Sequence, residues 1–277
     1  MALAMKPENE QGGVHPALCN EMCMLITPAR VAYIGLLGRP QVREFGALTM
    51  YIALDDAFQI QVAGGEWASA RMFVVAPDTP HRITSTDRLI GLFLIEPETV
   101  NLDLLPLWLQ PSNSALQCLP ALEQVCSAFQ SLRNKQVNVA GVKDNVDEFF
   151  LGQSLAIRRL DARMEAIVDK INLDSCGLTS AEGCAKQVNL SFSRFLHLFR
   201  DDVGTTFRSF RAWKRARNFL CHVDKPCSLT DIALDIGYPD SSHFSHTVRR
   251  YWGLTPKDIL AGSRRLAVIR HNTLGEH

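Results

Sequence analysis

The stretch that most constrains the fold is residues 228–256, which predict two short helices joined by a tight turn. In its first half, apolar residues recur at helical spacing, and either Ser228 or Thr230 is placed to cap the start. Gly237 follows, and a glycine can end a helix in the left-handed conformation without a steric penalty. The stretch therefore predicts a helix-turn-helix unit.

The second helix of this unit has one apolar and one polar face. Either Asp240 or Ser241 can cap its start, and Phe244, Val248 and Tyr251 fall on the side that would be buried. The other side carries Ser242, His243, Ser245, His246, Arg249 and Arg250. A polar face that ends in two arginines suits a helix lying in the major groove of DNA.

About eight residue types at fixed offsets carry a resemblance to a known family. They are Ile232-Ala233, Gly237-Tyr238, Ser242-His243-Phe244, Arg249-Arg250, Gly253 and Thr255-Pro256. Together they resemble the second helix-turn-helix of the AraC/XylS family of bacterial transcription regulators. Val248 stands where that family usually has Phe, which should reduce core volume without changing the fold. The resemblance implies a C-terminal all-α domain of two such units joined by a long helix.

The sequence upstream supplies the other unit. Residues 178–188 predict its supporting helix and residues 191–202 its reading helix, and the long helix begins near Phe207. Cations of the long helix form a ridge, interpreted as a phosphate contact rather than a solvated face: Arg208, Arg211, Lys214, Arg215 and Arg217. The resemblance implies DNA contact by Ser193, Arg194, Leu196, His197, Arg200, Arg208, Arg211, Arg215, Ser242, His243, His246, Arg249 and Arg250.

Charge divides the chain of 277 residues into two halves, although its formal net charge is zero. Residues 1–160 hold 12 Lys and Arg against 16 Asp and Glu, a net of −4, whereas residues 161–277 hold 17 against 13, a net of +4. A basic half beside an acidic half is typical of a DNA-binding domain joined to another domain. We therefore predict a sensing or dimerisation domain over 1–160 and a DNA-binding domain over 161–277.

Residues 24–100 contain six or seven short runs rich in Val, Ile, Phe and Tyr, separated by Gly, Pro and Asp. They predict a small β-barrel, which resembles the cupin-type barrel found in many AraC-type regulators. Two amphipathic helices are predicted within 121–156, one over 121–132 and one over 142–156. The resemblance implies a dimer contact there, while plain packing against the barrel is the alternative. The fold class is α+β.

The barrel could receive a small-molecule effector, with wall residues Tyr33, Tyr51, Phe58, Trp67, Phe73 and His81, or these side chains could simply fill its interior. Only His15 and His81 precede residue 160, so a metal-binding barrel is not expected. The eight cysteines lack paired zinc-site spacing and are expected to be reduced thiols. No cofactor is expected.

We therefore interpret the chain as a cytoplasmic DNA-binding transcription regulator, with activation favoured over repression and no enzyme activity. Expected partners are double-stranded promoter DNA, RNA polymerase, a second copy of the chain and a small-molecule effector, with no membrane. One alternative is a regulator whose barrel binds a protein partner. The other is a barrel enzyme with an appended DNA-binding domain, but no catalytic triad, phosphate loop or nucleotide fingerprint is present in the sequence.

Overall fold

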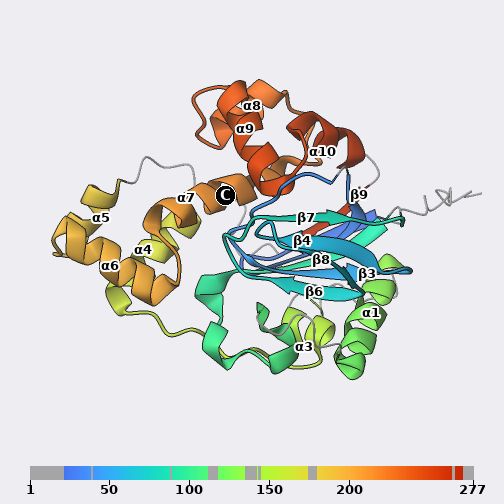
Figure 1. The fold of residues 1–277 in the computed structure, drawn as a ribbon. Helices are drawn as coiled ribbons and strands as arrows, with labels where there is room; N and C mark the ends of the chain where they lie inside the picture. Colours follow the sequence, from blue (N-terminus) through green and yellow to red (C-terminus); the bar gives the residue numbers. More distant parts are fainter. Residues whose placement is uncertain are drawn as a thin grey trace, which may run out of the picture.

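A computed structural model describes residues 22–38, 40–87, 89–111, 118–134, 142, 145–173, 180–263 and 266–270. The strands form a central layer (Figure 1). Helices α8, α9 and α10 lie on one side of it, α1 and α3 on the other, and α4, α5 and α6 at one end. The fold is α+β, with cupin-like sheets followed by a helical domain, as the sequence predicts.

The strands form two sheets. The larger sheet has the order β6-β3-β8-β2-β1-β9, and the smaller has the order β5-β4-β7. Among the described strands, every pairing is antiparallel except that of β1 with β9. The strands are β1 (Met22–Ile26), β2 (Arg30–Leu36), β3 (Leu48–Ala53), β4 (Phe58–Val62), β5 (Trp67–Ala70), β6 (Met72–Val75), β7 (His81–Thr84), β8 (Leu89–Ile95) and β9 (Leu266–Arg270). The sequence predicts neither β5 nor β9.

The larger sheet is buried on both faces. Along β3, Met50 and Ile52 pack with α1 and α3, whereas Tyr51 and Ala53 pack on the opposite face. Every residue of β3 and of β8 is buried. Two-sided burial explains why these strands have continuous apolar runs rather than an alternating pattern.

The helices predicted from the sequence are present in the structure, but some of them begin or end at other residues than predicted. The α-helices are α1 (Leu119–Arg133), α3 (Val146–Leu151), α4 (Ala162–Leu173), α5 (Ala181–Gln187), α6 (Phe192–Val203), α7 (Phe207–Asn218), α8 (Leu229–Asp235), α9 (Ser241–Trp252) and α10 (Pro256–Ser263). Short 3₁₀ segments are η1 (Pro97–Thr99), η2 (Leu102–Leu104), η3 (Leu107–Leu109) and η5 (Phe219–His222).

Two of the predicted helices have different bounds in the structure. The helix expected over 142–156 is wrong in extent, because Gly152 adopts a φ of 71° and ends α3 there. The start expected at Leu178 lies outside the described residues, and α5 begins after Ser180, whose side chain caps it. The sequence does not predict α10. Within the described part of the chain, no helix is both long and apolar enough to cross a bilayer.

The two helix-turn-helix units are packed differently. The first, formed by α4, α5, α6 and the start of α7, has its own core around Phe195, Phe199 and Phe207. The second shares one continuous core with the sheets, in which Phe244 and Tyr251 belong to the same cluster as Tyr51. The first unit is therefore a separate packing unit, whereas the second is built onto the barrel.

Candidate nucleic-acid interface and effector cavity

The first reading helix is α6. The Ser191 hydroxyl accepts a hydrogen bond from the backbone N–H of Arg194 at 3.4 Å, and Gly204 ends the helix with a φ of 86°. Phe195 and Phe199 are fully buried on its inner face. These contacts fix the rotation of α6 about its axis, so its polar side turns toward solvent.

The second reading helix is α9, and its supporting helix α8 begins with a capping box. Ser228 and Asp231 satisfy each other's backbone N–H groups there. The Asp240 carboxylate accepts hydrogen bonds from the backbone N–H groups of Ser242 and His243 at 2.8 and 2.7 Å. Between the alternatives that the sequence left open, the structure therefore selects Ser228 and Asp240 as caps.

Most of the residues with expected DNA contacts are exposed. On α6, Leu196 is the exception, because it packs partly against the core of the first unit. On α7, Arg211 and Arg215 are half-buried, and the Arg215 guanidinium lies 5.5 Å from the centre of the Tyr238 ring. The exposed residues are Ser193, Arg194, His197, Arg200, Arg208, Ser242, His243, His246, Arg249 and Arg250.

Two cations of the expected ridge do not face solvent. Lys214 is only 5% exposed, and its Nζ lies 2.5 Å from both Glu96 Oε2 and Glu98 Oε1. Arg217 Nε lies 2.7 Å from Glu96 Oε1, and the Trp213 Nε1–H donates to Glu96 at 3.0 Å. The interpretation of Lys214 and Arg217 as phosphate contacts is wrong in this structure, because the carboxylates that follow β8 pair with them.

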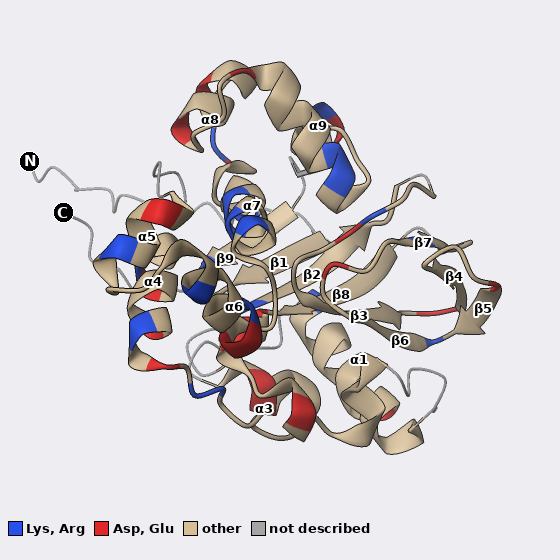
Figure 2. Ribbon diagram, turned by 60° about the vertical axis from the view of Figure 1, so that its left-hand side comes forward, with Lys and Arg blue, Asp and Glu red and all other residues tan. Residues whose placement is uncertain are grey.

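The C-terminal end of α9 also contacts the barrel. Arg250 forms a two-point ion pair with Glu44, at 2.8 and 3.2 Å. Figure 2 shows basic residues on α7 and at the end of α9, both close to the strands. Some cations of the second unit thus lie on its outward face, and one of them, Arg250, pairs with the barrel.

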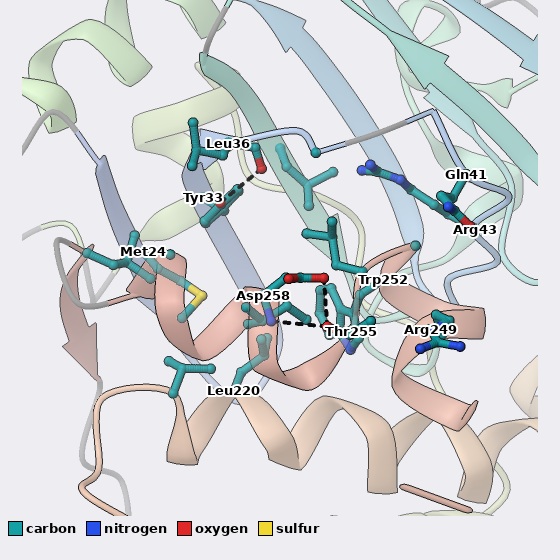
Figure 3. Close-up of a pocket in the computed structure, with 18 of the residues that line it drawn as sticks. Met24, Tyr33, Leu36, Gln41, Arg43, Leu220, Arg249, Trp252, Thr255 and Asp258 are labelled. Atoms are coloured by element: carbon teal, nitrogen blue, oxygen red, sulfur yellow. Dashed lines mark hydrogen bonds between the residues drawn. The ribbon is translucent and has the colours of Figure 1, made fainter. Parts of the chain in front are cut away.

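A cavity of about 650 Å³ lies between the sheet and the second unit (Figure 3). Its strand side includes Met24, Tyr33 and Arg43, and its helix side includes Trp252 and Asp258. Its volume falls in the range of small-molecule sites, roughly 300–1,000 Å³. The sequence leaves open whether an effector binds inside the barrel, whereas this cavity lies where the second unit covers one face of the sheet.

Of the six expected wall residues, Tyr33 alone lines this cavity. Tyr51 and Phe58 are fully buried in the barrel, Phe73 packs partly against the same core, and Trp67 is 45% exposed. The lining residues of the second unit could not be predicted from the sequence, since nothing local indicates that α9 and α10 face a sheet.

His81 has a structural role in the barrel. Its Nδ1 lies 2.8 Å from the Thr79 carbonyl oxygen, and its Nε2 lies 2.7 Å from the Tyr51 hydroxyl. Burial lowers the pKa of His81 to about 4 and raises that of Tyr51 to about 12. The neutral ring therefore donates from Nδ1 and accepts from Tyr51, which holds β7 against β3.

Arg43 is a buried cation beside the cavity. It is 5% exposed, and its Nη2 donates to the Leu37 carbonyl oxygen. Its Nε has no hydrogen-bond partner, and among the described residues no carboxylate forms an ion pair with Arg43. In Figure 3 its guanidinium points toward the cavity. A buried charge is costly without a counter-ion.

Metal-ligating side chains are scattered in the structure. No cluster of three or more His, Cys, Asp or Glu side chains suited to a metal ion occurs in the part of the chain that the structure describes. Cys23 and Cys184 are buried, and Cys227 is exposed.

A family model described as a helix-turn-helix domain matches residues 184–262. The HTH-type transcriptional activator RhaS of Klebsiella pneumoniae (strain 342) is 36% identical over 84 residues, which cover 29% of this chain and 30% of that protein. The match thus spans less than a third of the length of this relative.

The solved structures with a similar fold include ToxT from Vibrio cholerae. ToxT of strain O395 has a TM-score of 0.55 at 11% identity and covers 84% of this chain and 97% of its own. The same protein bound to (E)-4-(8-methylnaphthalen-1-yl)but-3-enoic acid has a TM-score of 0.50 at 12% identity and covers 84% of this chain and 98% of its own. At these identities the similarity shows the fold.

Proposed function

Because this chain is a regulator of the AraC/XylS family, we propose that it binds a two-part promoter element through α6 and α9 and activates transcription there. The observation that supports this most directly is the pair of capped helices whose polar faces are exposed. Helices of this kind enter successive major grooves roughly 34 Å apart. The relative RhaS is described as a transcriptional activator, and this supports the activator role proposed here.

Direct readout of bases makes a specific prediction for Arg194. We expect Arg194→Ala to weaken binding to the selected site by about 5- to 150-fold, corresponding to the ~1–3 kcal/mol of a bidentate arginine–guanine contact. The site is first selected from a random DNA pool with the full chain, and affinity is then measured by fluorescence anisotropy at fixed salt.

Arg82→Ala is the matched control, because Arg82 is an exposed arginine of the barrel and its loss changes the net charge equally. Equal affinities for the two variants would remove Arg194 from the DNA contacts. Failure of the full chain to enrich any sequence would contradict the proposed function itself.

We further propose that residues 161–277 bind DNA and that residues 1–160 sense an amphiphilic organic anion in the cavity. Arg43 would pair with the acidic group, while Met24, Leu92 and Ile259 would contact the apolar part. The ToxT structure with a bound butenoic acid supports a carboxylate in this fold. A regulator whose barrel binds a protein partner is the alternative, and it predicts no response to such acids.

The acid found in that ToxT structure is a suitable probe for Arg43. We expect Arg43→Gln to weaken its binding roughly 10- to 150-fold, because a hydrogen bond to a charged group contributes about 1.5–3 kcal/mol. Isothermal titration of the full chain measures this affinity. The primary amide of the same acid is the control, since it should bind the wild type weakly and be insensitive to Arg43→Gln.

Location and assembly are also part of the proposed role. We infer a location in the cytoplasm, where promoter DNA and RNA polymerase are found. We also infer a homodimer that uses α1 and α3, since these helices cover the sheet face opposite the second unit (Figure 1). Analytical ultracentrifugation of the full chain tests the dimer.

A further inference from the structure

The two reading helices belong to different packing units, and the helix α7 joins these units (Figure 1). Phe207 and Phe210 of α7 pack in the core of the first unit, whereas Trp213 packs in the core shared with the barrel. Among the residues that the structure describes, no side chain belongs to both cores. The position of α6 relative to α9 therefore depends on α7 and on contacts outside the two cores.

One such contact joins the barrel to the start of α7. Thr205 lies between Gly204, which ends α6, and Thr206, which caps α7. It is 8% exposed, and its hydroxyl donates a hydrogen bond to Asp78 Oδ2 at 2.7 Å. Asp78 belongs to the barrel loop between β6 and β7, residues 76–80. The barrel loop thus contacts the junction between α6 and α7.

Backbone geometry holds Asp78 in place beside both units. Its φ is 55°, a left-handed conformation that Asp adopts more readily than most residues, and its N–H donates to the Phe45 carbonyl oxygen at 2.7 Å. Burial raises the pKa of Asp78, and the hydrogen bond from Thr205 lowers this pKa. Glu44 raises the same pKa and Arg250 lowers it. The Asp78 carboxylate therefore lies near the ion pair that joins the barrel to α9.

The relative position of two reading helices decides which DNA they can bind together. One turn of DNA takes about 10–10.5 base pairs, so one added base pair moves the second recognition block by about 3.4 Å along the axis and turns it by roughly 35°. Two helices held rigidly cannot follow this displacement. Two helices that are joined loosely can follow it by moving relative to each other.

We propose that Asp78 and Thr205 brace the first unit against the barrel and thereby set the separation of the two base blocks that α6 and α9 read. The proposal rests on the DNA-binding function proposed above. The barrel thus distinguishes operators that contain the same two blocks at different separations. Asp78 and Thr205 are positioning residues, because neither lies on the polar faces of α6 and α9.

Thr205→Val tests the brace, because it removes the hydroxyl and leaves a side chain of similar shape. The two-block site is selected with the wild-type full chain, and fluorescence anisotropy then measures affinity for duplexes with one or two base pairs added or removed between the blocks. One added base pair should weaken wild-type binding about tenfold or more, since a misplaced helix loses at least one base contact. The same change should weaken binding of Thr205→Val by less than about threefold.

A second variant and two controls separate the brace from a general loss of structure. Asp78→Gly removes the acceptor but suits the left-handed φ, and it should show the same relaxed dependence on block separation as Thr205→Val. Thr205→Ser keeps the hydroxyl and should restore the wild-type dependence. Thr79→Val removes a hydroxyl of the same loop that donates to the Pro77 carbonyl oxygen, and it should also behave as the wild type.

Two results would overturn the brace. One is a wild-type dependence on block separation in Thr205→Val and Asp78→Gly, with circular dichroism showing which of them is folded; a single folded variant is sufficient. The other is a wild-type chain that binds all separations within about threefold, because its reading helices would then not be held at a fixed distance. If the wild-type chain enriches no DNA sequence, the proposed function fails and not the brace alone.

Discussion

Replacing Glu96 with glutamine is expected to lower the free energy of unfolding by about 3–5 kcal/mol, because it removes one partner from a buried ion cluster. Glu96 is fully buried and contacts Lys214, Arg217 and Trp213. In the variant, the positive charges of Lys214 and Arg217 remain in the interior without the negative charge of Glu96 to offset them. Chemical denaturation monitored by tryptophan fluorescence measures the change.

Glu44→Gln is the matched control, because Glu44 pairs with an arginine whose side chain is 54% exposed. Its loss should change stability by less than about 1 kcal/mol. Similar effects of the two substitutions would contradict the special role of the buried cluster.

The same cluster makes stability depend on pH. Burial alone would raise the pKa of Glu96, but Lys214 and Arg217 hold that pKa below its usual range. The contribution of the ionised Glu96 side chain to the free energy of unfolding is therefore complete above the pKa of an unfolded glutamate, about 4.3. It is lost as pH falls through the lower pKa that Glu96 has in the folded state. Glu96→Gln should remove this component of acid sensitivity.

Phe199→Ala is expected to unfold the first helix-turn-helix unit while the barrel and the second unit remain folded. Phe199 is fully buried in the separate core, and such a truncation costs about 3–5 kcal/mol. All four tryptophans lie outside that core, at positions 67, 108, 213 and 252. Heating should therefore lower the helical circular dichroism signal before tryptophan fluorescence changes.

Phe244→Ala is the matched comparison, because Phe244 is equally buried but belongs to the core that includes the barrel. It should shift both signals together to lower temperature. A single coincident transition in Phe199→Ala would show that the first unit is not an independent packing unit.

Local signals explain which features could be predicted from the sequence. Ser228, Asp240 and Gly253 act through hydrogen bonds or backbone conformations within a few residues of their own positions. The helix-turn-helix units could therefore be located without knowledge of the rest of the chain. The exposed face of α9 followed from the same spacing, since Phe244 and Val248 are buried.

Features that depend on distant residues could not be predicted. The position of Lys214 along α7 follows the same helical spacing as the cations expected to be exposed. Only its ion pairs with Glu96 and Glu98, more than a hundred residues earlier, hold it in the interior. Likewise, Arg43 in the barrel has no local feature that indicates a cavity formed with α10.

The sequence by itself determined the double helix-turn-helix and the strand-rich domain before it, because caps, turns and apolar periodicity act over short distances. Only the tertiary structure decided that the second unit packs on the barrel, that β9 joins its sheet and that the cavity lies between them. These features depend on complementary side chains far apart in sequence, which no local pattern records.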